Sequence, residues 1–181
     1  LNELVPIYDY WTERGIDISI FKDIKGGVFS GKGLMREKFV FPIFNSKNQI
    51  VGLSGRDLTN KSKLRWIHKG QKTLWVYPAF LNVKYIQEKK SVILVEGIGD
   101  LLALYSCGIR NVICTFGTEC SYAIINFLLK LGQINIVISL NSDEPGKLAS
   151  EKMYKRLVKY FNVVFKSLTL SFEENLCSPI L

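Results

Sequence analysis

The second half of the chain alternates strand-like and helix-like segments, and this alternation restricts the fold more than any other feature. Four short apolar runs are predicted strands, at residues 91–97, 111–118, 134–140 and 162–168. Three amphipathic or apolar segments between them are predicted helices, at residues 99–108, 122–132 and 146–160. Strands that alternate with helices need crossover connections, so this half is predicted to be an α/β domain with a mostly parallel sheet flanked by helices.

The first half has a different pattern, which predicts a smaller α+β module with antiparallel strands. A helix is expected around residues 3–13, and loops are expected at Gly26, Gly27, Gly31 and Gly33. The expected strands are residues 38–44, 49–56, 64–68 and 73–77, the first two joined by a turn at 45–48. We therefore expect a basic subdomain over residues 1–90, the parallel-sheet domain over 91–168 and a tail over 169–181.

The positive charge of the chain lies in the first half. Residues 1–90 hold 16 Lys and Arg against 8 Asp and Glu, a net +8, whereas residues 91–181 hold 8 of each and are neutral. Aromatic residues such as Trp66 and Trp75 lie among these cations. This combination suits a polyanion such as nucleic acid, although a solvated charged surface is the equal alternative on charge alone.

Several classes of protein are disfavoured. No run of 18 or more apolar residues is present, so no membrane span is predicted. The four cysteines form no CxxC pair and there is one histidine, which argues against a zinc site. No glycine-rich dinucleotide or P-loop motif follows a predicted strand. We expect an intracellular, cytoplasmic protein.

Acidic residues follow two of the predicted strands. Glu96 ends the first strand of the sheet, and Asn141, Asp143 and Glu144 follow the third. The carboxyl ends of parallel strands are where such sheets place functional groups, and oxygen ligands without His or Cys favour Mg²⁺ or Mn²⁺. A metal beside a basic surface points to phosphate-transfer chemistry on nucleotides or nucleic acid. The alternative is that Asp143 only caps the following helix and Glu96 only ends a strand.

These residues carry a resemblance to a known family. The segments VILVEGIGDLLAL and LNSDEPG resemble the Toprim domain, which has an E-G after its first strand and a D-x-D-x-x-G after a later one. Glu96 and Gly97 match the first motif, Asp143 and Gly146 match the second, and Asn141 replaces the first acid of the pair. Toprim domains occur in DNA primases, topoisomerases and some nucleases.

The first half resembles one of these groups. REKFVFPIFNSKNQIVGLSGR, YDYWTERGI, HKG with LWVYP, and FGTECS are similar to ordered motifs of the DnaG-like primase catalytic core of bacteria and phages. The resemblance covers about residues 7–160. It implies template-directed synthesis of short RNA primers on single-stranded DNA from ribonucleoside triphosphates, with a replicative helicase as partner.

The resemblance also implies roles for particular residues. Glu96 and Asp143 are the expected catalytic and metal-binding acids. Three further metal-binding candidates are Asn141, Glu144 and Asp100. The expected contacts to nucleic acid or nucleotide are Arg56, Lys63, Arg65, Lys69, Gly117 and Thr118. The replacement at Asn141 leaves the number of metals open, and the stretch between Arg56 and Lys69 is shorter than in the bacterial enzymes.

Two alternatives stay open. One is another Toprim enzyme, such as a nuclease or a topoisomerase-like cleaver. The other is a non-catalytic, primase-like module that binds nucleic acid.

Overall fold

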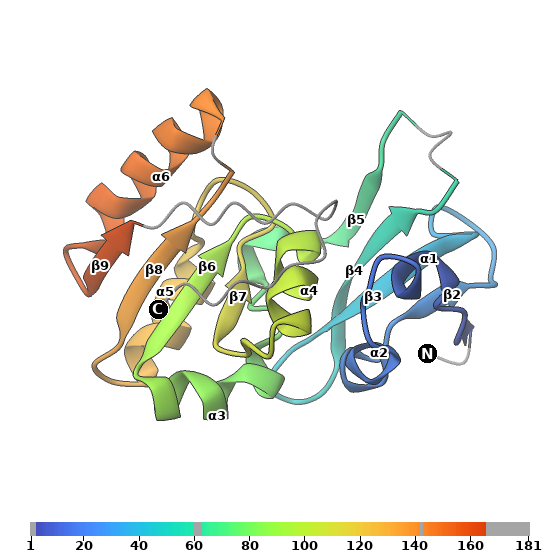
Figure 1. The fold of residues 1–181 in the computed structure, drawn as a ribbon, viewed down its shortest axis with the longest axis horizontal. Helices are drawn as coiled ribbons and strands as arrows, with labels where there is room; N and C mark the ends of the chain where they lie inside the picture. The colour runs from blue at the N-terminus through green and yellow to red at the C-terminus, as the bar shows by residue number, and fades with distance from the viewer. Residues whose placement is uncertain (1–2, 60–62, 142, 166–181) are drawn as a thin grey trace. The chain divides into compact units, whose positions relative to one another are not determined.

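A computed structural model describes residues 3–59, 63–141 and 143–165 (Figure 1). Two compact units divide the chain between Trp75 and Val76. The boundary expected from the sequence, after residue 90, stays a prediction. The second compact unit includes α3 (Ala79–Lys89), which packs against strands of that unit.

The first unit is an antiparallel sheet of five strands in the order β1-β2-β3-β4-β5. Its strands are β1 (Leu4–Val5), β2 (Gly27–Phe29), β3 (Lys38–Phe44), β4 (Ile50–Asp57) and β5 (Trp66–Gly70). The helices are α1 (Asp9–Thr12) and α2 (Ile18–Ile24). Trp11 and Phe21 from these helices pack against Phe39 and Phe41 of β3, and this aromatic cluster forms the core of the unit.

Several expectations for the first unit were wrong. The helix predicted over residues 3–13 is confined to Asp9–Thr12, because Pro6 cannot donate a backbone hydrogen bond within a helix and Leu4–Val5 pair with β2 instead. Gly27 lies in β2 rather than a loop, and a Cβ there would come within 2.8 Å of the Val5 carbonyl oxygen. Residues 73–77 form no strand: Lys72–Leu74 is a 3₁₀ turn, and the Trp75 ring packs on Gly52, which has no side chain.

The second unit confirms the predicted mixed α/β fold, with a parallel sheet in the order β7-β6-β8-β9. Its strands are β6 (Ser91–Val95), β7 (Val112–Cys114), β8 (Asn135–Ser139) and β9 (Asn162–Phe165). The helices that follow the first three in chain order are α4 (Ile98–Ser106), α5 (Tyr122–Lys130) and α6 (Glu144–Leu157). The remainder of the predicted strand 162–168 and the predicted tail 169–181 lie outside the described residues.

Helices cover both faces of this sheet. Residues of α5 and α6 share one buried cluster with β6 and β8, which includes Leu94, Ile138, Leu128 and Met153. Helix α4 packs against β6 and β7 outside that cluster, on the opposite face (Figure 1). The chain therefore leaves β6 toward one face and leaves the adjacent β8 toward the other, so the carboxyl ends of these two strands flank the switch point where such sheets place their ligands.

Candidate functional site at the carboxyl ends of β6 and β8

Glu96 directly follows β6 at the switch point. It is half-buried, and burial raises the pKa of its carboxyl, with further contributions from the negative charges of Asp100 and Asp143. Its backbone carbonyl accepts a hydrogen bond from the Gly117 N–H at 3.2 Å, which ties the loop after β7 to the end of β6. A carboxylate held near two others in this way favours either a proton or a cation.

Asp100 lies in the first turn of α4 and is occupied locally. Its Oδ2 accepts a hydrogen bond from the Gly97 N–H at 3.0 Å, which caps the helix. Burial raises the pKa of Asp100, while this backbone hydrogen bond opposes the shift. The metal-binding role expected for Asp100 stays a prediction, and its hydrogen bond to the helix terminus gives it a structural role.

Asp143 is the N-cap residue of α6. Its Oδ1 accepts a hydrogen bond from the Gly146 N–H at 2.8 Å, and the residue is exposed. The glycine is required at position 146 because a Cβ there would collide with the Asn141 carbonyl oxygen. The close approach of Gly146 to Asn141 folds the strand end back on the helix start, so the D-x-x-G spacing has a direct steric cause.

Glu144 interacts with a neighbouring lysine on the surface of α6. Glu144 forms an exposed ion pair with Lys147, with 2.9 Å between Oε1 and Nζ. The charges that raise the pKa of Glu96, after burial, are those of Asp100 and Asp143. Within the described ranges, no group of three or more His, Cys, Asp or Glu side chains is arranged to hold a metal.

Gly117 and Thr118 lie in the loop that follows β7. Phe116 and Gly117 have positive φ angles of 56° and 148°, and Thr115 Oγ1 donates a hydrogen bond to the Gly117 carbonyl. Thr118 is exposed and lines a groove beside α6. The loop is therefore anchored next to Glu96 through Gly117, while Thr118 faces solvent.

Arg56 is held by aromatic side chains in the first unit. Its Nη2 donates a hydrogen bond to the Tyr10 hydroxyl at 3.0 Å, and its guanidinium carbon is 5.5 Å from the centre of the Trp66 ring. Arg14 lies over the same Tyr10 ring, 3.7 Å from its centre. Tyr10 and Arg14 were missed as site candidates from the sequence, although they lie in the YDYWTERGI segment.

Lys69, another predicted cation, does not share a face of the sheet with Arg56. Arg56 pairs with Trp66 in the β4–β5 register, whereas Lys69 pairs with Leu53. Directly opposed residues share a face and successive residues alternate, so the side chains of Arg56 and Lys69 leave opposite faces of the sheet. Lys63 and Arg65 precede β5 and are exposed.

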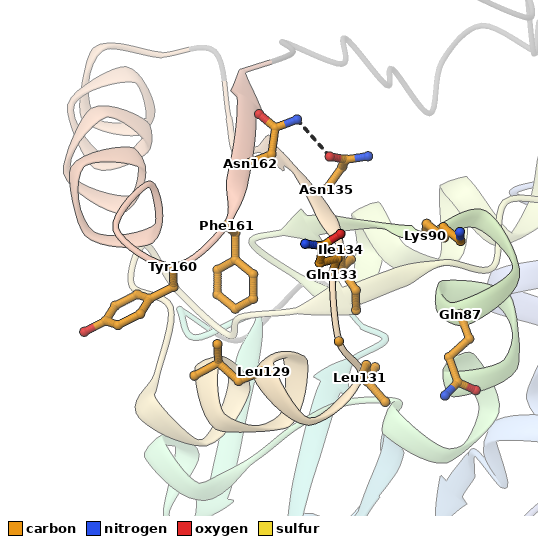
Figure 2. Close-up of a pocket in the computed structure, with 11 residues that line it drawn as sticks. Gln87, Lys90, Leu129, Leu131, Gln133, Ile134, Asn135, Tyr160, Phe161 and Asn162 are labelled. Carbon is orange, nitrogen blue, oxygen red and sulfur yellow. Dashed lines mark hydrogen bonds between the residues drawn. The ribbon is translucent and has the colours of Figure 1, made fainter.

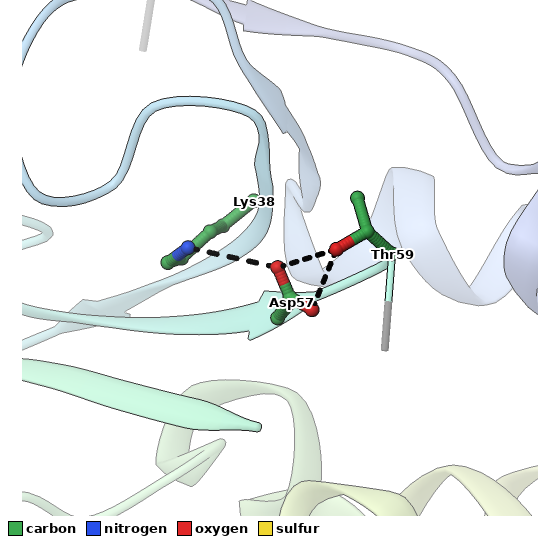
Figure 3. A network of polar contacts seen from close by, with 3 residues as sticks. All are labelled: Lys38, Asp57 and Thr59. Atoms are coloured by element: carbon green, nitrogen blue, oxygen red, sulfur yellow. Dashed lines mark hydrogen bonds and ion pairs between the residues drawn. The ribbon is translucent and has the colours of Figure 1, made fainter. Parts of the chain in front are cut away.

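The buried carboxylate of Asp57, next to Arg56, belongs to a polar network with Lys38 and Thr59 (Figure 3). Its Oδ1 is 3.8 Å from the Lys38 Nζ, and the Thr59 hydroxyl donates to both carboxylate oxygens at 3.3 and 3.0 Å. This network compensates the charge of Lys38 within the protein, so we do not count Lys38 as a contact to a polyanion.

A pocket of the second unit lies at the other end of its sheet (Figure 2). It has a volume of about 800 Å³ and is lined by residues at the amino ends of β8 and β9, where Asn162 donates a hydrogen bond to Asn135 at 2.8 Å. None of the predicted site residues lines it. Because parallel sheets bind ligands at their carboxyl ends, the acids and not this pocket define the candidate site.

Comparison with known proteins agrees with this geometry. Residues 90–166 match the Toprim domain family. The DNA primase of Borreliella burgdorferi is 28% identical over 160 residues, covering 83% of this chain and 30% of that protein. The DNA primase of Helicobacter pylori is 32% identical over 145 residues, covering 77% of this chain and 25% of that protein. The chain thus spans less than a third of the length of these curated relatives.

Solved structures have the same fold. The zinc-binding and RNA polymerase domains of Aquifex aeolicus primase superpose with a TM-score of 0.75 at 23% identity, covering 91% of this chain and 50% of that one. A DnaG primase catalytic domain bound to single-stranded DNA superposes with a TM-score of 0.77 at 19% identity, covering 91% of this chain and 64% of that one.

The parallel sheet with acids at its switch point is therefore a Toprim domain. The chain belongs to the DNA primase family, and its fold is that of the DnaG catalytic core. Among the described residues, no helix has both the length and the apolar character needed to cross a membrane.

Proposed function

We propose that this chain is the catalytic core of a DNA primase, which joins ribonucleotides into short primers on a single-stranded DNA template. The observation that carries the proposal is the approach of Glu96 and Asp143 at the switch point between β6 and β8. The relatedness to DNA primases supports the choice of reaction. We also expect the protein to act in the cytoplasm, beside a replicative helicase.

The carboxylates fit a magnesium or manganese ion. Mg²⁺ is typically held by one or two carboxylates together with substrate phosphates and water, so two acids suffice and a cage of three is not required. The pKa of Glu96 is raised first by burial and then by the nearby like charges, and a divalent cation would offset that repulsion. Glu96 and Asp143 would hold the ion, with the Asn141 side-chain oxygen as a neutral neighbour.

When bound, the ion supplies charge neutralisation on the triphosphate and acidification of the attacking hydroxyl. The protein contributes the positions of its own groups. The hydrogen bond between Gly117 and Glu96 anchors the loop after β7, and the Gly146–Asn141 contact places Asp143 at the start of α6. Arg56, oriented by Tyr10 and Trp66, provides a guanidinium suited to a phosphate of the template or the nucleotide.

The test is a synthesis assay with single-stranded DNA, labelled ribonucleoside triphosphates and Mg²⁺ or Mn²⁺. Labelled oligoribonucleotides that disappear in Glu96→Gln and Asp143→Asn would support the proposal. Template cleavage without synthesis would instead indicate a Toprim nuclease. Binding of single-stranded DNA with neither reaction would indicate a non-catalytic module.

A further inference from the structure

Helix α6 has a charge imbalance that the site described above does not use. From residue 144 to residue 159 the acids are Glu144 and Glu151, and the bases are Lys147, Lys152, Lys155, Arg156 and Lys159. The segment therefore has a net charge of +3, although residues 91–181 as a whole are neutral. Within residues 91–181, the local excess of positive charge is thus found on α6 and the residues directly after it.

Two of these cations line a groove, which we call the α6 groove. It has a volume of about 420 Å³, with residues 118–120 on one side and α6 on the other, and its α6 side includes Leu148, Lys152 and Arg156. Lys152 and Arg156 are four residues apart, so they lie on the same side of the helix at a spacing of about 6 Å. Like charges at this spacing repel each other, and an anion in the groove would relieve the repulsion.

Arg156 is oriented before any ligand arrives. Its guanidinium carbon lies 4.3 Å from the centre of the Tyr122 ring, and Tyr122 is 72% exposed. Stacking on the ring restricts the plane of the guanidinium, which reduces the entropy lost when that group binds a phosphate through paired hydrogen bonds. The exposed ring next to it offers a surface on which a base or sugar can pack.

The α6 groove leads away from the candidate site. At one end are Thr118, in the loop anchored beside Glu96, and Pro145, two residues after Asp143. Lys152 lies nine residues beyond Asp143, about 13 Å along the helix axis. A polymer that leaves the carboxylates along α6 would meet Lys152 first and Arg156 one turn later.

We propose that the α6 groove binds the phosphodiester backbone of nucleic acid next to the catalytic acids. The choice of ligand rests on the proposed function, whereas the groove and its oriented arginine do not depend on it. An acidic peptide is the less suitable ligand, because the carboxylate of Glu119 on the opposite wall would repel it. A phosphodiester backbone has one charge per nucleotide, and its phosphates can all face the cations of α6, away from Glu119.

The experiment measures binding of a single-stranded DNA oligonucleotide and of an RNA–DNA hybrid duplex as a function of salt concentration. The test variant is Lys152→Gln with Arg156→Gln, and the matched control is Lys155→Gln with Lys159→Gln, which removes the same charge from the same segment outside the groove lining. At 0.1 M salt, each phosphate contact that is lost should weaken binding roughly five- to tenfold and reduce the salt slope by about 0.7 to 0.9.

A loss of binding in the groove variant but not in the control variant supports the inference. If single-stranded DNA shows the loss, the groove binds the template strand; if the RNA–DNA duplex shows it, the groove binds the hybrid. Equal losses in the groove and control variants would mean general charge attraction and would overturn it, as would no loss in either. Groove-dependent binding of poly-glutamate with the affinity seen for nucleic acid would also overturn it.

Two further variants serve as controls. One tests whether the groove variant loses binding through a folding defect, and the other tests whether the first unit still binds nucleic acid when the α6 groove does not. Tyr122→Leu keeps both cations and should give a smaller loss than the double variant. Arg56→Ala reports on the first unit: if it weakens binding while the groove variant does not, only the α6 groove is wrong. If wild type binds neither ligand, both proposals are wrong.

Discussion

At the scale of single residues, the environment of Glu96 is the most informative feature. Its carboxyl follows a buried strand, and burial together with Asp100 and Asp143 disfavours its ionised form. The same charge crowding that destabilises the metal-free protein would attract a divalent ion. We therefore expect Glu96 to be needed for activity and to lower the stability of the metal-free protein.

Replacing Glu96 by Gln should stabilise the metal-free protein at neutral pH. A carboxyl whose pKa is raised on folding holds its proton more tightly in the native state, so stability falls as pH rises from its ordinary pKa through the raised value. The gain should therefore appear at pH 7 and vanish below the ordinary pKa of a glutamate, near pH 4. Thermal unfolding in EDTA at both pH values measures it, with Glu151→Gln as control. A destabilised Glu96→Gln at pH 7 would contradict the assignment, and primer synthesis by this variant should be abolished.

Asn141→Asp should lower the Mg²⁺ concentration needed for half-maximal primer synthesis. It restores a carboxylate near Asp143, which should strengthen the attraction for a divalent ion by on the order of a few kcal/mol before desolvation offsets part of it. A Mg²⁺ titration of synthesis by wild type and Asn141→Asp checks this, with Asp143→Asn expected to be inactive. Identical titration curves for wild type and Asn141→Asp would place residue 141 outside the metal site.

Tyr10→Phe should weaken binding of single-stranded DNA without unfolding the first unit. It removes the hydroxyl that accepts the Arg56 hydrogen bond but keeps the ring that packs on Trp11. Losing one such bond is worth about 1 kcal/mol, or roughly fivefold in affinity. Fluorescence anisotropy measures the change. In an Arg56→Ala background the same substitution should have no effect, and an undiminished effect there would show that Tyr10 does not act through Arg56.

At the scale of secondary-structure elements, the junction between β8 and α6 is fixed by a glycine. Gly146 lies against the Asn141 carbonyl, while Asp143 caps the helix through the Gly146 N–H. These two contacts determine where the acid at this strand end is placed. The corresponding junction after β6 is less crowded, because the nearest atom to a Cβ on Gly97 would be 3.5 Å away.

Gly146→Ala should therefore destabilise the protein far more than Gly97→Ala. The collision at position 146 is with backbone, which cannot move without shifting Asn141 and Asp143, and we expect a loss of about 2 to 4 kcal/mol. Gly97→Ala should cost less than about 1 kcal/mol, because its φ of −127° suits any residue. Chemical denaturation of both variants makes the comparison. Equal losses would show that the Gly146–Asn141 contact does not hold the junction.

At the scale of the whole molecule, most of the basic residues and the candidate catalytic acids lie in different units. The first unit contains most of the basic residues and the aromatic support for Arg56, while the second contains the acids and the basic α6 surface. Because Arg56 and Lys69 leave opposite faces of the first sheet, they should not act as one pair.

Single-stranded DNA binding should weaken steeply with salt, and Arg56→Ala should reduce both affinity and salt slope by the amount expected for about one phosphate contact. Lys69→Ala should have a smaller effect, since it lies on the other face of the sheet. Equal effects that add in the double variant would show that nucleic acid reaches both faces. An unchanged salt slope in Arg56→Ala would remove Arg56 from the binding surface.

Much of the second unit could be predicted from the sequence because the relevant signals are local. Apolar runs of strand length alternate with helical periodicity, and parallel pairing then places Glu96 and Asp143 at the same edge of the sheet. Helix α3 and the short helix α2 were not predicted, and the helix at the start of the chain was predicted too long.

The order of strands and helices after residue 91, and the acids that follow them, could be predicted from the amino-acid sequence alone. The strand order in the sheet could not: β6 lies between β7 and β8, which makes the ends of β6 and β8 a switch point. Only the tertiary structure decided this, and also that Arg56 rests on Tyr10 while Lys69 faces away. The physical reason is that periodicity acts between neighbours in the chain, whereas strand order, register and aromatic packing depend on contacts between residues far apart in sequence.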